Sequence, residues 1–248
     1  MLRLNQVSAE VSGKMLLSPL SVTLDTPCCV GIIGANGAGK STLLKTIGQN
    51  IAYQGEVLWQ NQPLAALSEP QRAACMAFMP QHSQMAFALS VQEIVEMGVM
   101  MHPQLKNKNA VVHQAMAQFE ITELKAQNYL HLSGGEKQRV HAARVWAQIQ
   151  ATDVPKLVLL DEPTSALDLK HQHFFLQHTQ QLAQKHIVLI VLHDLNLVSR
   201  YCDKLLLLRR GELINFGDTK TLMTAQTIHA LYDYHAEVFE HNNRIHIS

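Results

Sequence analysis

A glycine-rich run near the start of the chain has the residue types that a phosphate chain needs. It fits the pattern G-x-x-x-x-G-K-[S/T] and consists of Gly34, Ala35, Asn36, Gly37, Ala38, Gly39, Lys40, Ser41 and Thr42. Because glycines leave the loop bare, its backbone N–H groups can approach a triphosphate closely. Lys40 would contact the β- and γ-phosphates, and the hydroxyl of Ser41 would bind Mg²⁺. The run therefore predicts a site for a nucleoside triphosphate with Mg²⁺.

Two elements flank this run in the order that the pattern requires. Residues 28–33 form a short apolar run that predicts a buried strand, and residues 41–47 predict a helix. The positive end of such a helix points at the phosphates. A chance glycine-rich turn is the alternative, but the four fixed positions and these flanks disfavour it.

Two acids end a second predicted strand. Asp161 and Glu162 directly follow the apolar residues 157–160. Ligands of α/β sheets bind at the carboxyl ends of strands, so Asp161 is suited to hold Mg²⁺. Glu162 is suited to polarise the water that attacks the γ-phosphate. The alternative is a solvated acidic pair, which the nearby phosphate pattern disfavours.

A second glycine-rich run starts a helix. Ser133 and Glu136 form a capping box, and between them stand Gly134 and Gly135, which are poor helix formers. These glycines are explained if free N–H groups and the Ser133 hydroxyl must approach an anion closely. A plain glycine-rich helix cap is the alternative. Since the chain already has one phosphate loop, the run suggests a second contact to the nucleotide.

The elements that must position these residues alternate along the chain. Strands are expected at 2–7, 20–24, 55–59, 74–79, 157–160, 187–192, 204–208 and 213–216, with a terminal hairpin over 236–247 bent at Asn242-Asn243. Helices are expected at 41–47, from Ser90 to Gly98, from Asn109 to Phe119, and at 133–149 and 169–184, with one or two short helices within 219–232.

This order favours an α/β fold with a mostly parallel sheet and an antiparallel β layer from the N-terminal strands. We expect one domain in which residues 83–132 are an inserted helical subdomain. Residues 1–82 and 133–248 would form the nucleotide-binding core.

Composition narrows the classes of partner. The net charge is zero and the pI about 7.2, which disfavours a nucleic-acid partner. The four cysteines lack C-x-x-C spacing, which favours a reducing cytosol. The start has no signal-like apolar stretch, and the longest apolar runs are too short to span a bilayer. We expect a soluble chain that sits on a membrane only through another protein.

Four histidines lie near the end of the chain: His229, His235, His241 and His246. Their spacing matches no metal motif, so solvated or packed histidines are the simpler interpretation. Their role stays open.

The motifs together resemble the ATP-binding subunit of an ABC transporter. The resemblance rests on Gly34–Thr42, Leu132–Gln138, Leu157–Glu162 and His193, and it covers nearly the whole chain. It implies a P-loop NTPase core of the RecA-like type with ATP and Mg²⁺ as its ligands. It also implies a head-to-tail homodimer in which each ATP lies between the loop of one copy and Ser133-Gly134-Gly135 of the other.

Other positions acquire roles only through this resemblance. Gln81 matches a glutamine that reaches Mg²⁺ and the attacking water, and Asp168 ends a loop through which the two copies communicate. His193 matches a histidine that contacts the γ-phosphate; taken alone, it would be a packed core histidine. Val11 stands where many relatives stack an aromatic ring on adenine, which puts the strength of adenine binding in doubt.

The chain shows one nucleotide-binding unit and no fused membrane span, which resembles importers with two separate permease subunits. The runs at 79–83, 86–91, 161–172 and 191–197 are similar to those of haemin-importer ATPases. This implies a place on the cytoplasmic face of the inner membrane and an indirect partnership with a periplasmic haemin-binding protein. Close relatives import ferric siderophores or cobalamin, and these cargoes stay as alternatives.

Two other classes of ABC ATPase are rivals. A soluble one that acts in iron–sulfur cluster assembly would share the motifs and the length, although the run at 162–168 favours the transporter type. DNA- or ribosome-associated ones carry coiled-coil insertions or paired nucleotide domains, and neither is visible here. The neutral charge also disfavours a phosphate-backbone partner.

Overall fold

The computed structural model describes residues 1–81, 87–241 and 244–248. Outside this range lie His82, Ser83 and Ala86, which belong to the haemin-importer resemblance, and the predicted bend at Asn242-Asn243. The boundary predicted between residues 82 and 83 falls there too.

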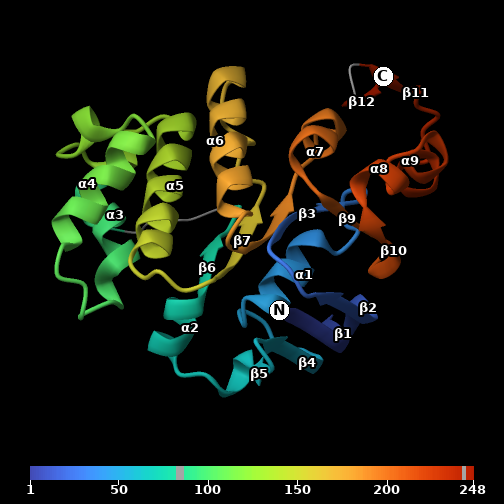
Figure 1. Cartoon of the computed structure of the whole chain (residues 1–248), viewed down its shortest axis with the longest axis horizontal. Helices are drawn as coiled ribbons and strands as arrows, with labels where there is room; N and C mark the ends of the chain where they lie inside the picture. Colours follow the sequence, from blue (N-terminus) through green and yellow to red (C-terminus); the bar gives the residue numbers. More distant parts are fainter. Residues whose placement is uncertain (82–86, 242–243) are drawn as a thin grey trace.

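A six-stranded sheet forms the centre of the molecule (Figure 1). Its order is β10-β9-β3-β8-β7-β6, and every pair is parallel except β9 with β10. The strands are β3 (Cys28–Ile33), β6 (Met76–Met79), β7 (Leu157–Asp161), β8 (Ile187–Val191), β9 (Lys204–Arg209) and β10 (Glu212–Asp218). The predicted mostly parallel sheet is confirmed.

The N-terminal strands build a second, antiparallel sheet of order β2-β1-β4-β5. Its strands are β1 (Leu2–Val11), β2 (Lys14–Leu24), β4 (Gln54–Trp59) and β5 (Gln62–Pro63). The 3₁₀ helix η1 (Leu64–Ala66) follows them. This sheet is the predicted β layer, so the predicted fold class is confirmed.

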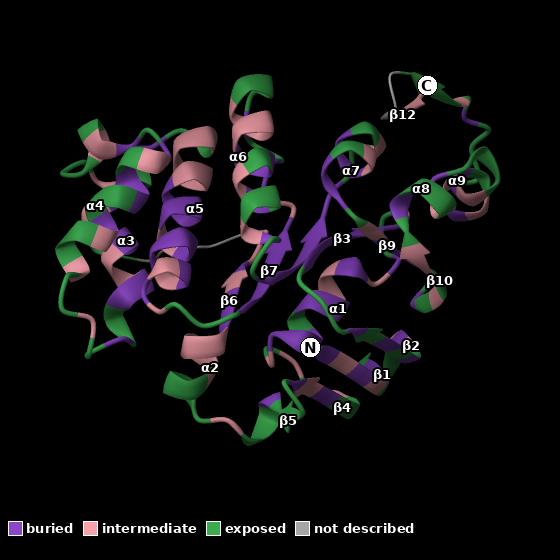
Figure 2. Cartoon of the chain, viewed as in Figure 1, coloured by how far each residue is buried: buried purple, intermediate pink, exposed green. Residues whose placement is uncertain are grey.

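Alternating side chains of the central sheet divide the interior into two cores. Leu157 and Leu159 pack with helix α1 (Lys40–Ile47) and the antiparallel sheet, whereas Val158 and Leu160 pack with the helices on the other face. Successive side chains of a strand point to opposite faces, so a strand covered on both faces is continuously apolar. Figure 2 shows β7 and β3 as buried throughout. Helix α1 thus fixes the glycine-rich loop between the two sheets.

Three helices stand together on one side of the central sheet (Figure 1). They are α3 (Val91–Met100), α4 (Lys108–Gln118) and α5 (Gly134–Gln150), with the 3₁₀ turns η2 (Thr122–Leu124) and η3 (Tyr129–His131) between the last two. Phe119 packs edge-on against Trp146, with ring centroids 5.0 Å apart. The helix α5, assigned to the core by sequence, packs against both α3 and α4. The proposed limits of an inserted subdomain at 83–132 stay a prediction.

Two predicted helix limits in this region were wrong. Helix α3 does not stop at Gly98 but continues to Met100, because the glycine is a packing position: an added Cβ would lie 2.2 Å from the carbonyl oxygen of Arg144 on α5. The N-cap of α4 is Asn107 rather than Asn109, and the helix begins at Lys108. The polar run offers several asparagines of similar capping preference, and packing selects among them.

A third correction concerns residues 74–79, which were predicted to be one strand. A helix, α2 (Glu69–Cys75), occupies the first two of these positions, and β6 begins only at Met76. Ser68 and Gln71 form the capping box of α2, with Pro70 in its first turn. These start signals lie upstream of the apolar run that indicated a strand.

The last third of the chain completes the sheet and adds a small terminal hairpin. Its helices are α6 (Leu169–Leu182), α7 (Leu195–Tyr201), α8 (Thr219–Leu222) and α9 (Ala225–Tyr232), and the hairpin consists of β11 (Val238–His241) and β12 (Arg244–Ile247). Strand β12 packs against α7. Among the described residues, no helix combines the length and the apolar character needed to cross a bilayer.

Candidate functional site

Four neighbouring strands of the central sheet end at the same edge and deliver the predicted catalytic residues there. The glycine-rich loop follows β3, and His193 follows β8. Asp161 ends β7 and Glu162 directly follows it, while Gln81 follows β6. Because these strands are parallel, their carboxyl ends lie together (Figure 1).

The loop over 34–42 is bare and partly left-handed, as a phosphate cradle requires. Gly37 and Gly39 have φ of 77° and 98°, a region that side chains strain. A Cβ at Gly34 would lie 2.1 Å from the carbonyl oxygen of Leu208, whereas nothing lies within 4 Å of a Cβ at Gly37. The loop lines a cavity of about 220 Å³ together with Leu16 and Glu162.

Lys40 is the buried cation of this cavity. Its ammonium donates to the carbonyl oxygens of Gly34, at 2.7 Å, and Ala35, at 3.1 Å. Burial lowers the pKa of Lys40, although Glu162 and Asp161 oppose this effect. The ammonium is therefore held by two neutral oxygens where phosphate oxygens would bind it more strongly.

Asp161 is a buried carboxylate whose charge Lys45 and Lys40 stabilise less than burial destabilises it. Its side chain accepts a hydrogen bond of 3.0 Å from the Ser41 hydroxyl, and the residue is only 1% exposed. Burial raises the pKa of Asp161, and the neighbouring Glu162 raises it further. A buried carboxylate and a hydroxyl in contact are a set of oxygen donors that fits Mg²⁺.

Through its carboxylate, Glu162 contacts side chains that follow the two strands on either side of β7. Its carboxylate accepts from Nε2 of Gln81 at 2.6 Å, and its other oxygen lies 2.7 Å from Nε2 of His193. The side chain is 13% exposed and that of His193 is 49% exposed, so the pair lies at the mouth of the cavity. Glu162 has φ of 50°, which is uncommon for a residue with a side chain. Such strain is typical of functional sites.

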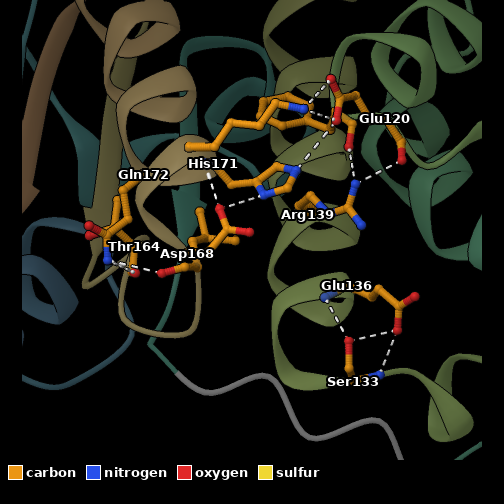
Figure 3. A network of polar contacts seen from close by, with 11 residues as sticks. Glu120, Ser133, Glu136, Arg139, Thr164, Asp168, His171 and Gln172 are labelled. Carbon is orange, nitrogen blue, oxygen red and sulfur yellow. Dashed lines mark hydrogen bonds and ion pairs between the residues drawn. The ribbon is translucent and has the colours of Figure 1, made fainter.

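The second glycine-rich run lies apart from this cavity. Ser133 caps α5: its hydroxyl donates to the Glu136 carboxylate at 2.7 Å, and Glu136 N donates back to it (Figure 3). Ser133 and Gly134 are exposed, and neither lines the cavity. Asp168 is also exposed, at the start of α6. Within one chain, the structure brings Gln81, Asp161, Glu162 and His193 to the loop but not Ser133, Gly134, Gly135 or Asp168.

Two further contacts to the site were not predicted. The Tyr232 hydroxyl accepts a hydrogen bond of 3.0 Å from the N–H of Gly34, and Nε2 of Gln138 donates to the carbonyl oxygen of Glu162 at 3.1 Å. Burial raises the pKa of Tyr232. Gln138 lies inside the motif run and could have been found there. Tyr232 stands 198 positions from Gly34, and no local pattern connects them.

The structure also places Val11 and the terminal histidines, whose roles the sequence left open. Val11 ends β1 and is exposed, beside the turn at Ser12-Gly13. The terminal histidines form ring pairs: His229 stacks on His235 with centroids 4.1 Å apart, and His246 stacks on Phe239. In the described part of the chain, no group of three or more His, Cys, Asp or Glu side chains could hold a metal ion.

Comparison with known proteins gives consistent similarities. The sequence profile of the family described as "ABC transporter" matches residues 17–165. A hemin import ATP-binding protein, HmuV, of Plesiomonas shigelloides is 41% identical, covering 99% of this chain and 100% of the relative. A protein of the same name from Pseudomonas aeruginosa is 39% identical, over 99% and 98% of the two chains.

Solved structures of ABC transporter proteins have a similar fold. A metal-chelate type ABC transporter in an inward-facing conformation superposes with a TM-score of 0.80 and 28% identity, over 100% of this chain and 96% of that one. A dimeric bacterial ABC transporter cassette has a TM-score of 0.77 at 24% identity, over 88% and 99%. The second likeness concerns the fold alone.

The burial of Asp161 predicts a pH-dependent gain of stability when its charge is removed. A carboxyl whose pKa is raised on folding destabilises the fold as the pH rises from about 3.9 through the raised value. Asp161→Asn keeps an acceptor for Ser41 and cannot ionise. Its free energy of unfolding should match that of the parent near pH 3 and exceed it at pH 7 by on the order of 1 kcal/mol.

Urea unfolding without nucleotide, at both pH values, measures this difference. Asp25→Asn, in the exposed turn after β2, serves as the control and should show no pH-dependent gain. A less stable Asp161→Asn protein at pH 7 would contradict the account of this carboxylate.

Proposed function

Because the chain belongs to the ABC transporter family and carries its ATP-hydrolysing unit, we propose that it energises the import of haemin into a bacterium. In this proposal Glu162 is the catalytic carboxylate, and its position beside the glycine-rich loop is the observation that carries the assignment. The cavity, the buried cation and the strained acid are parts that phosphoryl transfer needs.

The proposed reaction is an in-line attack of water on the γ-phosphate. The backbone of the loop and Lys40 hold the phosphates, and the Glu162 carboxylate accepts the proton of the attacking water. Gln81 and His193 hold that carboxylate from both sides, at 2.6 and 2.7 Å, so it is oriented before the substrate arrives. His193, whose side chain is 49% exposed, would contact the γ-phosphate in this proposal.

Mg²⁺ fits Ser41 and Asp161, with Gln81 as a third contact. When bound there, it would neutralise charge on the phosphates. The fit is supported by the 3.0 Å contact of Ser41 with a carboxylate whose charged form is disfavoured by burial. In this proposal the site would attract Mg²⁺ because the cation would stabilise the ionised carboxylate of Asp161.

We further propose that two copies of the chain complete each ATP site. Ser133, Gly134, Gly135 and Asp168 do not line the cavity of their own chain. Ser133 and Gly134 are exposed at the start of a helix longer than eight residues, where N–H groups can bind the phosphates of a partner's ATP. A head-to-tail dimer would use these surfaces and enclose two ATP molecules.

The membrane partners in the proposal are two permease subunits, contacted through the helical region at 83–132. Phe87 and Met100 there are 74% and 67% exposed, an unusual placement for large apolar side chains. ATP-driven closure of the dimer would move these helices and transmit the motion to the permease. The chain would then lie on the cytoplasmic face of the inner membrane, with a periplasmic haemin-binding protein as an indirect partner.

Haemin is the preferred cargo because the relatives named above, at about 40% identity over nearly the whole chain, are called hemin import proteins. The metal-chelate type of the superposed transporter agrees with this class. The ATPase does not touch the cargo in this mechanism, so a ferric siderophore or cobalamin is the alternative to be tested.

Glu162→Gln tests the catalytic assignment. The amide keeps the size of the side chain but cannot accept the proton, so we expect steady-state ATP hydrolysis to fall by about 10²–10³-fold while ATP binding is retained. Phosphate release measures the first effect and fluorescent-nucleotide binding the second. Glu212→Gln, on the exposed strand β10, is the matched control. Turnover of Glu162→Gln near the parent rate would refute the general-base role.

Growth on haemin tests the cargo. A strain that lacks this gene and any other haemin-uptake system is complemented with the parent, Glu162→Gln or Glu212→Gln, and supplied with haemin as its sole iron source. We expect the parent and Glu212→Gln to restore growth and Glu162→Gln not to. If the parent restores uptake of a ferric siderophore or cobalamin but not growth on haemin, the cargo assignment is wrong. A chain that fractionates away from membranes in that strain would favour the rival role in iron–sulfur cluster assembly.

A further inference from the structure

A chain of polar contacts joins the start of α6 to the end of α4 (Figure 3). We propose that His171 is a positioning residue that holds the carboxylate of Asp168, and that Glu120 orients the ring of His171. The inference rests on the proposed function, in which Asp168 contacts the second copy of the chain. Neither His171 nor Glu120 belongs to the site described above.

The contact between His171 and Asp168 restrains an exposed carboxylate. One oxygen of Asp168 accepts from the backbone N–H of His171 at 2.9 Å and lies 2.7 Å from Nδ1 of the same residue. These two hydrogen bonds, the backbone one first, lower the pKa of Asp168. The side chain of Asp168 is 66% exposed, whereas that of His171 is only 20% exposed. The backbone bond alone would leave the carboxylate free to rotate, and the ring contact fixes its plane.

The other ring nitrogen of His171 faces a second carboxylate. Nε2 lies 3.4 Å from Glu120 Oε2, which is also 3.0 Å from the ammonium of Lys170. The hydrogen bond from Lys170 is the main cause of the lowered pKa of Glu120. Nδ1 contacts Asp168, and Nε2, which makes no hydrogen bond with the described residues, faces Glu120 at ion-pair distance, so the two carboxylates lie at opposite edges of the ring and favour one orientation of it.

Glu120 is itself held in place by its backbone. It has φ of 53°, a left-handed conformation just beyond the C-cap of α4. Its carbonyl oxygen accepts from the Arg139 guanidinium at 2.8 Å, and the carbonyl oxygen of Phe119 accepts from the same group at 3.2 Å. Arg139 belongs to α5, the helix that begins with Ser133-Gly134-Gly135. Glu120 is thus attached to the helix that presents the second glycine-rich run.

The network joins helix α5, at Arg139, to the loop that ends at Asp168 (Figure 3). The proposed dimer uses that loop and the start of the same helix. A shift of α5 and the end of α4 relative to α6 would move Glu120 away from His171 and release the Asp168 carboxylate. Through His171, a movement of the helical region would change the position of the Asp168 carboxylate at the dimer contact.

Two substitutions at position 171 separate the contacts of the ring. Asparagine places its amide near the position of Nδ1 and can still bind Asp168, but it cannot reach Glu120. Glutamine places its amide near Nε2 and can reach Glu120, but it loses the side-chain contact to Asp168. Lys170→Gln is the matched control, because it removes an ion pair to Glu120 without contacting Asp168.

The readout is ATP-induced dimerisation, measured by size-exclusion light scattering with all variants in a Glu162→Gln background that retains ATP. The contact occurs twice in a symmetric dimer, so His171→Gln should raise the protein concentration for half-dimerisation by about tenfold. His171→Asn and Lys170→Gln should stay within about twofold of the parent. Thermal unfolding confirms that each variant is folded.

If His171→Gln proves unfolded, Glu120→Gln replaces it in the test. That variant should weaken dimerisation in the parent but add nothing to His171→Asn, whose side chain no longer reaches Glu120. An equal weakening by Glu120→Gln in both backgrounds would overturn the inference.

The possible results distinguish the inference from the function on which it rests. A Glu162→Gln parent that stays monomeric with ATP overturns the proposed dimer and, with it, the role of His171. A parent that dimerises equally well with His171→Gln overturns only the role of His171. Equal loss in the Gln and Asn variants also overturns it, because asparagine retains the contact to Asp168.

Discussion

The carboxylate of Glu162, held between Gln81 and His193, is the interaction on which the site depends. The three residues come from the ends of three neighbouring strands, β7, β6 and β8, and their contacts are 2.6 and 2.7 Å long. Such a meeting is possible only at the carboxyl edge of a parallel sheet in this strand order. The left-handed backbone of Glu162 turns the side chain toward the loop after β3, and the hydrogen bond from Gln138 to its carbonyl oxygen stabilises that turn. A change of register in any of the three strands would separate the trio.

The packing that supports this edge of the sheet also buries two charged groups, Lys40 and Asp161. The central strands are apolar on both faces because α1 with the antiparallel sheet covers one face and α5, α6 and α7 cover the other. Lys40 and Asp161 end in this interior with their charges only partly satisfied, and the pKa values of both shift toward the neutral forms. The phosphates of a bound nucleotide would give Lys40 charged partners. In this account the burial of these two charges lowers the stability of the fold, and a ligand that pairs with them would recover part of it.

Sequence patterns could predict those parts of the fold and site that depend on local physical chemistry. The glycine-rich loop, the acids after residues 157–160 and the capping box at Ser133 each follow from residue types at short spacing. The same reasoning failed where tertiary contacts decide. Gly98 is a place where two helices approach closely rather than a helix stop. The helix that starts at the capping box of α2 continues to Cys75 and so occupies the first two positions of the strand predicted from residue 74. Tyr232 at Gly34, and Glu120 at His171, join positions 198 and 51 residues apart, for which no periodicity exists.

A double-mutant cycle at Gln81 and His193 tests the central interaction most directly. The rate of ATP hydrolysis is measured for the parent, Gln81→Ala, His193→Ala and the double variant, each at saturating ATP. If both residues hold one carboxylate besides making their own proposed contacts, each single change should slow hydrolysis by about 10–100-fold, and the double variant should be slowed by clearly less than the product of the two losses. Effects that multiply, so that the two losses add fully in free energy, would show that the residues act independently and would contradict the account.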